Sequence, residues 1–188
     1  MNPPAPPASA RYALPTPLGK LWLCLREGQP VAIDWADNRE RLQRNAGPAG
    51  PAGAVEDAAA SALLERLRRY FEGALDALQG LPLPPGGSAF QRAVWTATAA
   101  IPAGEVRSYA GLAESLGRPG SARAVATALA ANPCLLWVPC HRVVGSDGRL
   151  AGYAAGVERK RWLLEHEGHL ARLGSGASAL GSRVQAPG

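Results

Sequence analysis

The chain has 188 residues, of which 47% are hydrophobic, and it carries a formal net charge of +5. This length suits one large or two small globular domains, and no apolar run approaches the roughly 18 residues that a membrane-spanning helix needs. The three cysteines are an odd number with no C-x-x-C pair, which disfavours a disulfide framework or a zinc knuckle, so we expect a cytoplasmic protein without a bound metal.

Residues 11–80 predict a small α+β domain behind a disordered tail at residues 1–10. The tail, MNPPAPPASA, is rich in Pro and Ala and lacks the basic segment and apolar core of a secretory signal. Three short strands are predicted, at residues 11–19, 20–28 and 29–37. Within the second strand, Leu21, Leu23 and Leu25 alternate with other residues, which is the period of two of a half-buried strand.

A loop and a helix complete this first domain. The sequence NAGPAGPAG at 45–53 predicts a flexible loop, and a helix is expected at about 55–73. The apolar residues of this helix follow helical spacing at Leu63, Leu64, Leu67, Tyr70 and Phe71. Nothing in the domain suggests chemistry, and Cys24 is interpreted as a core residue.

The Pro/Gly-rich residues 81–87 are interpreted as a linker to a second domain at 88–172, which a Gly/Ala/Ser-rich tail follows at 173–188. Ser88 and Gln91 fit a capping box that opens a helix ending at Pro102. Basic residues outnumber acidic ones only in this second half of the chain. The excess indicates a polyanionic partner, although an Arg-rich composition explains it equally well.

Two short helices follow, with Ser108 and Ser121 placed as their N-caps, and together they give a helix-turn-helix pattern. Alanines cover most of the second helix, including Ala128, and its one long polar side chain is Arg123. Such a thin helix can approach a surface as narrow as a minor groove, about 6 Å wide. The alternative is an ordinary Ala-rich helix, because Ala has the highest helix propensity.

The stretch VPCHRVVG at 138–145 places a thiol beside an imidazole. Pro139 disturbs strand pairing, which predicts a reactive thiol at an exposed strand end. Adjacent strand residues point to opposite faces, so contact between Cys140 and His141 would need a bridging water or a bend at Pro139. A buried structural thiol is the alternative. A metal site of Cys134, Cys140 and His141 matches no standard zinc spacing.

Several motifs together resemble one known family. They are IPAGEVRSYAGLA, SARAV, NP, VPCHRVVG, GY and WLLEHEG, in this order between residues 88 and 168. The set is similar to the O6-alkylguanine-DNA alkyltransferases, also called methylated-DNA–protein-cysteine methyltransferases, for which PCHRV is highly specific. The resemblance implies an α+β fold, with a ribonuclease-H-like N-terminal domain and a mainly helical C-terminal domain that carries the helix-turn-helix.

The resemblance also implies catalytic roles. Cys140 matches the alkyl acceptor, and His141 and Glu167 match the partners that relay a proton through a bound water and hold the sulfur as a thiolate. Asn132 matches the residue that braces the active-site turn. Tyr109 matches the tyrosine that crowds the DNA phosphate during base rotation and can donate a proton to the departing guanine.

Binding roles follow in the same way. Arg123 matches the finger that fills the gap left by a flipped base. Further contacts with DNA are expected from Ala122, Ala124, Thr127 and Ser108. Guanine recognition is expected from backbone groups of Val143 and Ala154. The side chains of Tyr153 and Trp95 are expected to line the pocket.

The implied function is repair of duplex DNA by a monomer without a cofactor. Alkyl groups would pass from O6 of guanine, with O4 of thymine as a second candidate position, to Cys140 in one irreversible turnover. One alternative is an alkyltransferase-like protein that binds damage without transfer, although such relatives lack the cysteine present here. A thiol hydrolase unrelated to DNA is the third hypothesis, and its usual local signatures are absent.

Overall fold

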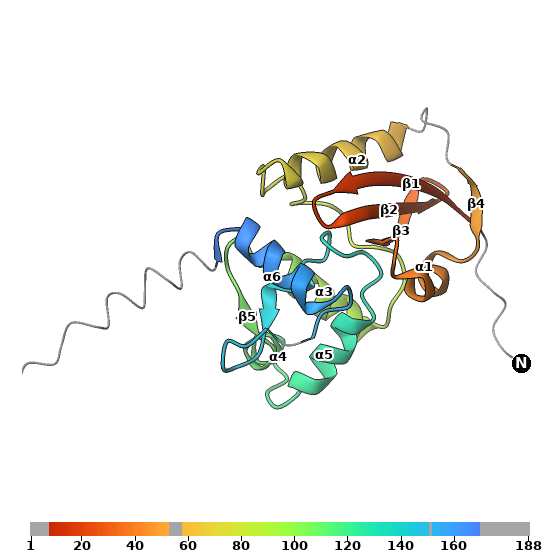
Figure 1. Cartoon of the computed structure of the whole chain (residues 1–188). Coiled ribbons are helices and arrows are strands. Elements are labelled where there is room, and N and C mark those ends of the chain that lie inside the picture. Colours follow the sequence, from red (N-terminus) through yellow and green to blue (C-terminus); the bar gives the residue numbers. More distant parts are fainter. Residues whose placement is uncertain (1–7, 53–57, 151, 170–188) are drawn as a thin grey trace, which may run out of the picture.

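The computed structural model describes residues 8–52, 58–150 and 152–169. These residues form a four-stranded sheet with two helices, followed by a mainly helical part (Figure 1). This arrangement confirms the α+β fold predicted from the sequence. None of the helices in the described ranges combines the length and apolar character needed to cross a bilayer.

The sheet consists of β1 (Ser9–Thr16), β2 (Gly19–Arg26), β3 (Gln29–Trp35) and β4 (Ala49–Ala52). The order is β3-β2-β1-β4, in which the first three strands are antiparallel and β4 runs parallel to β1. The three predicted strands are therefore confirmed. Strand β1 begins at Ser9, so Ser9 and Ala10 belong to the sheet rather than to a tail, and residues 1–7 and 170–188 lie outside the described residues.

The expected loop at 45–53 is wrong in part. Residues 39–46 form helix α1 (Arg39–Ala46), and residues 49–52 form β4, whose backbone pairs with β1. Gly and Pro in this segment hide the strand signal, because both residues are depleted in strands. Pairing with the edge of an existing sheet supplies the hydrogen bonds that local propensity does not favour.

The two faces of the sheet are covered differently. The alternating leucines of β2 are buried in the main core, which helix α2 (Ala58–Phe71) also contacts. Trp22 and Cys24 point to the other face, where they pack with Leu42 of α1. Cys24 is a fully buried core residue, as predicted, and its pKa is raised to about 11, mainly by burial.

The second half contains α3 (Ala89–Ala99), α4 (Tyr109–Ser115), α5 (Ala122–Ala130) and α6 (Val157–His166). The capping box of Ser88 and Gln91 is confirmed, as is the cap of Ser108, whose hydroxyl accepts a hydrogen bond from Gly111. Ser121 lies at the N-cap position of α5, but its side chain makes no capping hydrogen bond, so that part of the prediction is wrong. Strands β5 (Arg107–Ser108) and β6 (Val143–Val144) pair in parallel, and β5 leads directly into α4.

The two halves are joined through the backbone. The amide of Ile33 donates to the carbonyl of Pro133 at 3.1 Å, and the amide of Leu135 donates to the carbonyl of Ile33 at 3.0 Å. Strand β3 is an edge strand, so these bonds cover an edge that would otherwise lie open. The segment leading to Cys140 is therefore attached directly to the N-terminal sheet.

Candidate active site

Cys140 is the first residue of a one-turn 3-10 helix, Cys140–Arg142. The prediction that it lies at the end of a strand is therefore wrong. The residue is only 6% exposed, which also corrects the expectation of an exposed thiol. It nevertheless lines a cavity of about 430 Å³. The other lining residues are Tyr109, Ala126, Leu129, Ala130, Gly152, Tyr153 and Ala154. Access to this sulfur from outside therefore runs through the cavity.

Asn132 holds the turn that carries the cysteine. Its side-chain amide donates to the carbonyl of Val138 at 3.0 Å and lies 3.5 Å from Sγ of Cys140, while its Oδ1 accepts from the amide of Cys134. From the other half of the chain, the Arg41 guanidinium donates to the backbone carbonyl of Asn132 and pairs with Asp34 at 2.9 Å. Asn132 is thus fixed on both sides, as a bracing residue must be.

His141 is fully buried behind the cysteine. Its Nε2 lies 2.9 Å from Oε1 of Glu167, whereas Nδ1 has no hydrogen-bond partner in the part of the chain that the structure describes. Because the carboxylate accepts, we place the proton on Nε2, which leaves a lone pair on Nδ1. Burial lowers the pKa of His141 despite the nearby carboxylate, so the ring is neutral at pH 7 and able to accept a proton.

Glu167 is the centre of a buried polar cluster. Oε1 and Oε2 accept from Nη2 and Nε of Arg142 at 2.8 and 2.9 Å, and the Tyr70 hydroxyl donates to Oε1 at 2.7 Å. Burial alone would raise the pKa of Glu167, but the imidazole of His141 and the Arg142 guanidinium lower it well below its usual range. The carboxylate is therefore ionised and orients His141.

The Cys140 thiol is protonated at rest. Burial raises its pKa, and the nearby Asn132 amide, Arg41 and Lys160 offset only part of that effect. Lys160 is fully buried, its Nζ donates to the carbonyl of Val143 at 2.6 Å, and burial lowers its pKa to about 8. A base is therefore needed to form the thiolate, and a cation close by stabilises it.

The cavity has two walls. One is formed by helix α5, and the other by the segment from Gly152 to Ala154, with Tyr109 beside Cys140. The hydroxyl of Tyr153 is buried without a hydrogen-bond partner in the described ranges. Burial, with the nearby Cys140, raises the pKa of Tyr109, so its phenol keeps the proton.

Two predicted substrate-binding residues do not line this cavity. Val143 is fully buried behind the turn, and its carbonyl accepts from Lys160. Trp95 packs inside the core, where its indole N–H donates to the carbonyl of Ala128 at 2.9 Å. Its large apolar side chain therefore supports α5 from within, which sequence spacing alone does not distinguish from a pocket role.

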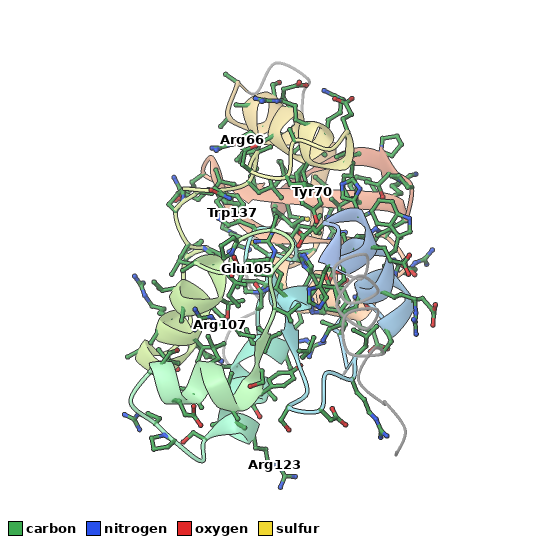
Figure 2. The ribbon with its side chains drawn as sticks, turned by 90° about the vertical axis from the view of Figure 1, so that its left-hand side faces the viewer. Arg66, Tyr70, Glu105, Arg107, Arg123 and Trp137 are labelled. Atoms are coloured by element: carbon green, nitrogen blue, oxygen red, sulfur yellow. The ribbon has the colours of Figure 1, made fainter. Side chains whose placement is uncertain are left out.

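The predicted DNA-contacting residues lie mostly on the open side of α5. Arg123 projects away from the body of the molecule (Figure 2). Arg123, Ala124 and Thr127 are exposed, whereas Ala122 and Ser108 are half-buried. Ala128, which we placed on the surface, is 2% exposed, because it faces Trp95. A face of small, uncharged side chains therefore lies between Arg123 and the mouth of the cavity, which Ala126 and Ala130 line.

Four residues of the site escaped the sequence interpretation: Tyr70, Arg41, Arg142 and Lys160. Their partners lie far away in sequence, such as Glu167, 97 residues from Tyr70. Of these four, Arg142 carried the clearest sequence signal, because it is a charged residue that follows the cysteine and histidine inside an apolar run. In the described ranges, no group of three or more His, Cys, Asp or Glu side chains is arranged to hold a metal ion.

Comparison with known proteins gives a consistent result. Residues 11–85 match the family model of the 6-O-methylguanine DNA methyltransferase ribonuclease-like domain, and residues 89–169 match that of the DNA-binding domain. A methylated-DNA–protein-cysteine methyltransferase of Shigella flexneri is 45% identical over 82% of this chain and 93% of its own. One from Mycolicibacterium paratuberculosis is 41% identical over 81% and 88%.

Solved structures are similar as well. The Mycobacterium tuberculosis OGT in complex with DNA has a TM-score of 0.69 and 35% identity, covering 84% of this chain and 92% of that one. The O6-methylguanine-DNA methyltransferase of Pyrococcus kodakaraensis has a TM-score of 0.61 and 25% identity, covering 85% and 99%. The architecture described above is therefore shared across this set.

Proposed function

This chain belongs to the 6-O-methylguanine DNA methyltransferase family, whose members carry out DNA repair by alkyl transfer to a cysteine, and we propose that the acceptor here is Sγ of Cys140. The observation that carries the proposal is the position of this sulfur. It faces a cavity, and a neutral histidine oriented by an ionised glutamate lies behind it. The substrate is duplex DNA alkylated at O6 of guanine.

The transfer is a displacement at carbon. The Sγ–H proton leaves through a relay that ends on Nδ1 of His141, and Glu167 stabilises the resulting imidazolium. The thiolate then forms the carbon–sulfur bond as the carbon–oxygen bond to guanine breaks. Guanine departs with the electron pair and takes up a proton, for which the Tyr109 phenol is the donor that lines the cavity. A thioether resists hydrolysis, so each molecule acts once.

The exposed face of α5 suits the rotation of the target base out of the duplex. The target oxygen is inaccessible inside a duplex, and unstacking the base costs a few kcal/mol. The face of α5 carries small side chains that allow close approach to the minor groove, and Arg123 projects from its first turn. In the proposed complex Arg123 occupies the place of the rotated base and offsets part of that cost.

A labelled duplex tests the proposal. The protein is mixed with DNA that carries radiolabelled methyl on O6 of one guanine, and label on the protein is counted. We expect one methyl per chain, located on Cys140 by peptide mapping, and none on Cys140→Ala, which still binds the duplex. Binding without transfer by the natural chain would instead indicate the damage-binding alternative, and neither binding nor transfer would indicate a thiol hydrolase.

We also propose that the protein acts as a monomer in the cytoplasm. The three cysteines are all buried and none is in a disulfide, as suits a reducing compartment. A single chain contains the cavity, the acceptor and the proton relay, so the proposed reaction needs no partner subunit. Sedimentation of the free protein tests the monomer.

A further inference from the structure

One wall of the cavity is held by the N-terminal half of the molecule. The side-chain amide of Asn38, which immediately precedes α1, donates to the carbonyl of Ala154 at 3.0 Å. The same nitrogen donates to Oδ1 of Asp34 at 2.9 Å. Asn38 therefore connects the buried carboxylate of Asp34 with Ala154, which lines the cavity and lies 116 residues after Asn38 in the sequence.

Asp34 makes this connection rigid. It is 1% exposed, its Oδ1 also accepts from the amide of Trp35, and its Oδ2 pairs with Arg41 at 2.9 Å. A buried carboxylate with this many donors has one stable orientation. The Asn38 amide is consequently fixed before it reaches Ala154.

A second bond acts on the next carbonyl of the segment. Nη1 of Arg159 donates to the carbonyl of Ala155 at 3.1 Å, and Nη2 of the same side chain pairs with Asp37 at 2.9 Å. Ala154 and Ala155 are thus both connected to residues 34–38, one directly and one through Arg159. Within the segment, the amide of Gly156 donates to the carbonyl of Tyr153 at 2.9 Å, and Gly152 and Gly156, which flank it, both have open space where a Cβ would lie.

The opposite wall is fixed from within. Helix α5 is held by the bond from the Trp95 indole to the Ala128 carbonyl, so its cavity-facing residues Ala126, Leu129 and Ala130 cannot retreat easily. The width of the cavity beside Cys140 therefore depends on where the segment containing Ala154 is held.

We propose that Asn38 is a specificity-determining positioning residue, which holds Ala154 at a fixed distance from α5 and so limits the size of the alkyl group that fits beside Cys140. This inference rests on the proposed alkyl transfer to Cys140. Asn38 touches neither the alkyl group nor the sulfur and acts through the Ala154 carbonyl. With that bond removed, the wall yields to a bulky group, whereas a methyl group gains no space and loses part of its alignment.

The test uses Asn38→Ala and Asn38→Ser. Single-turnover transfer is measured with duplexes carrying O6-methylguanine or O6-benzylguanine, and the maximal rate is separated from the half-saturating DNA concentration. We expect the benzyl-to-methyl ratio of maximal rates to rise about 3- to 10-fold in both variants, as loss of one hydrogen bond allows. The half-saturating concentrations should not change, because α5 is untouched.

The serine variant separates this role from helix capping. Asn38 occupies the N-cap position of α1, although its side chain makes no capping hydrogen bond there. Ser and Asn are equally good N-caps, but the serine hydroxyl is too short to reach Ala154. If Asn38 acted only through the stability of α1, Asn38→Ser would keep the natural ratio and Asn38→Ala alone would change it, which would overturn the proposal. Arg39→Ala, at the exposed neighbouring position, is the matched control and should keep the natural ratio.

An unchanged ratio in both variants, or an equal loss for both alkyl groups, would also overturn the role of Asn38. Those outcomes would leave the proposed function intact as long as the natural chain transfers methyl to Cys140. Failure of the natural chain to transfer either group would instead refute the proposed function itself.

Discussion

The hydroxyl of Tyr70 donates to Oε1 of Glu167 at 2.7 Å, and both side chains are buried. Tyr70 lies near the end of α2 in the N-terminal half (Figure 2), whereas Glu167 follows α6 near the end of the described chain. The same carboxylate oxygen orients His141. The N-terminal half therefore contributes directly to the hydrogen bonds of the catalytic cluster, although it holds no reacting atom.

Tyr70→Phe should destabilise the protein by about 1.5–3 kcal/mol, the usual contribution of a hydrogen bond to a charged group. Chemical denaturation measures this change. Tyr153→Phe is the matched control, because the Tyr153 hydroxyl is buried without a partner in the described residues and its loss should cost little. Equal destabilisation by the two variants would contradict the assigned bond.

Glu167→Gln should cost more, about 3–5 kcal/mol, because it leaves the buried guanidinium of Arg142 without a countercharge. It should also slow methyl transfer, since the neutral amide no longer stabilises the imidazolium that forms when His141 takes up the thiol proton. Stability by denaturation and single-turnover transfer are measured on the same preparation. A variant of natural stability would show that Arg142 finds another partner.

The folded protein should lose stability as the pH falls. His141 binds its proton more weakly when folded, so its contribution is present above its ordinary pKa of 6.5 and declines as the pH drops below that value. The pKa of Glu167 is likewise lowered, so its contribution declines below about 4.5. The free energy of unfolding, measured between pH 7 and 4, should decrease in that order. In Glu167→Gln the decrease below 4.5 should be smaller.

Iodoacetamide should report the raised pKa of the Cys140 thiol. Its rate of alkylation should rise with pH around a midpoint above that of a cysteine in a short peptide, because burial disfavours the thiolate. Asn132→Ala removes a hydrogen bond that favours the thiolate and should move the midpoint higher still. Cys140→Ala should show no rapid alkylation, because Cys24 and Cys134 are fully buried.

Arg123→Ala should slow methyl transfer from duplex DNA by about tenfold and leave transfer from free O6-benzylguanine unchanged. The reason is that this side chain supports the rotated state of the duplex, which a free base does not need. Arg69→Ala, an exposed arginine on α2 at the other end of the molecule, is the control and should behave as the natural protein (Figure 1). An equal loss with the free base would place Arg123 in the chemistry instead.

Local signals in the sequence predicted most of the fold. The alternation of apolar residues around Leu23 and the capping box at Ser88 each depend on residues within a few positions of one another. Both can therefore be recognised in the sequence without knowledge of the tertiary structure. Helix α1 was missed because its apolar content is low, and β4 because Gly and Pro dominate it. Both elements are stabilised by their contacts with the sheet.

The site was predictable where a motif carried it and not elsewhere. The acceptor, its histidine and Asn132 lie within ten residues and share one turn. The turn itself was misjudged, because the apolar run before Pro139 resembles a strand. Tyr70 and Asn38 could not be inferred, since each reaches the site only after the two halves pack together.

The burial of Cys140 has a consequence for its lifetime in a cell. Hydrogen peroxide oxidises thiolates far more readily than protonated thiols, and an oxidised sulfur can no longer accept an alkyl group. A protein that acts only once benefits from a sulfur that stays protonated until an alkylated nucleobase enters the cavity. The burial that makes Cys140 a poor nucleophile in the free protein thus also protects it from oxidation before it meets an alkylated base.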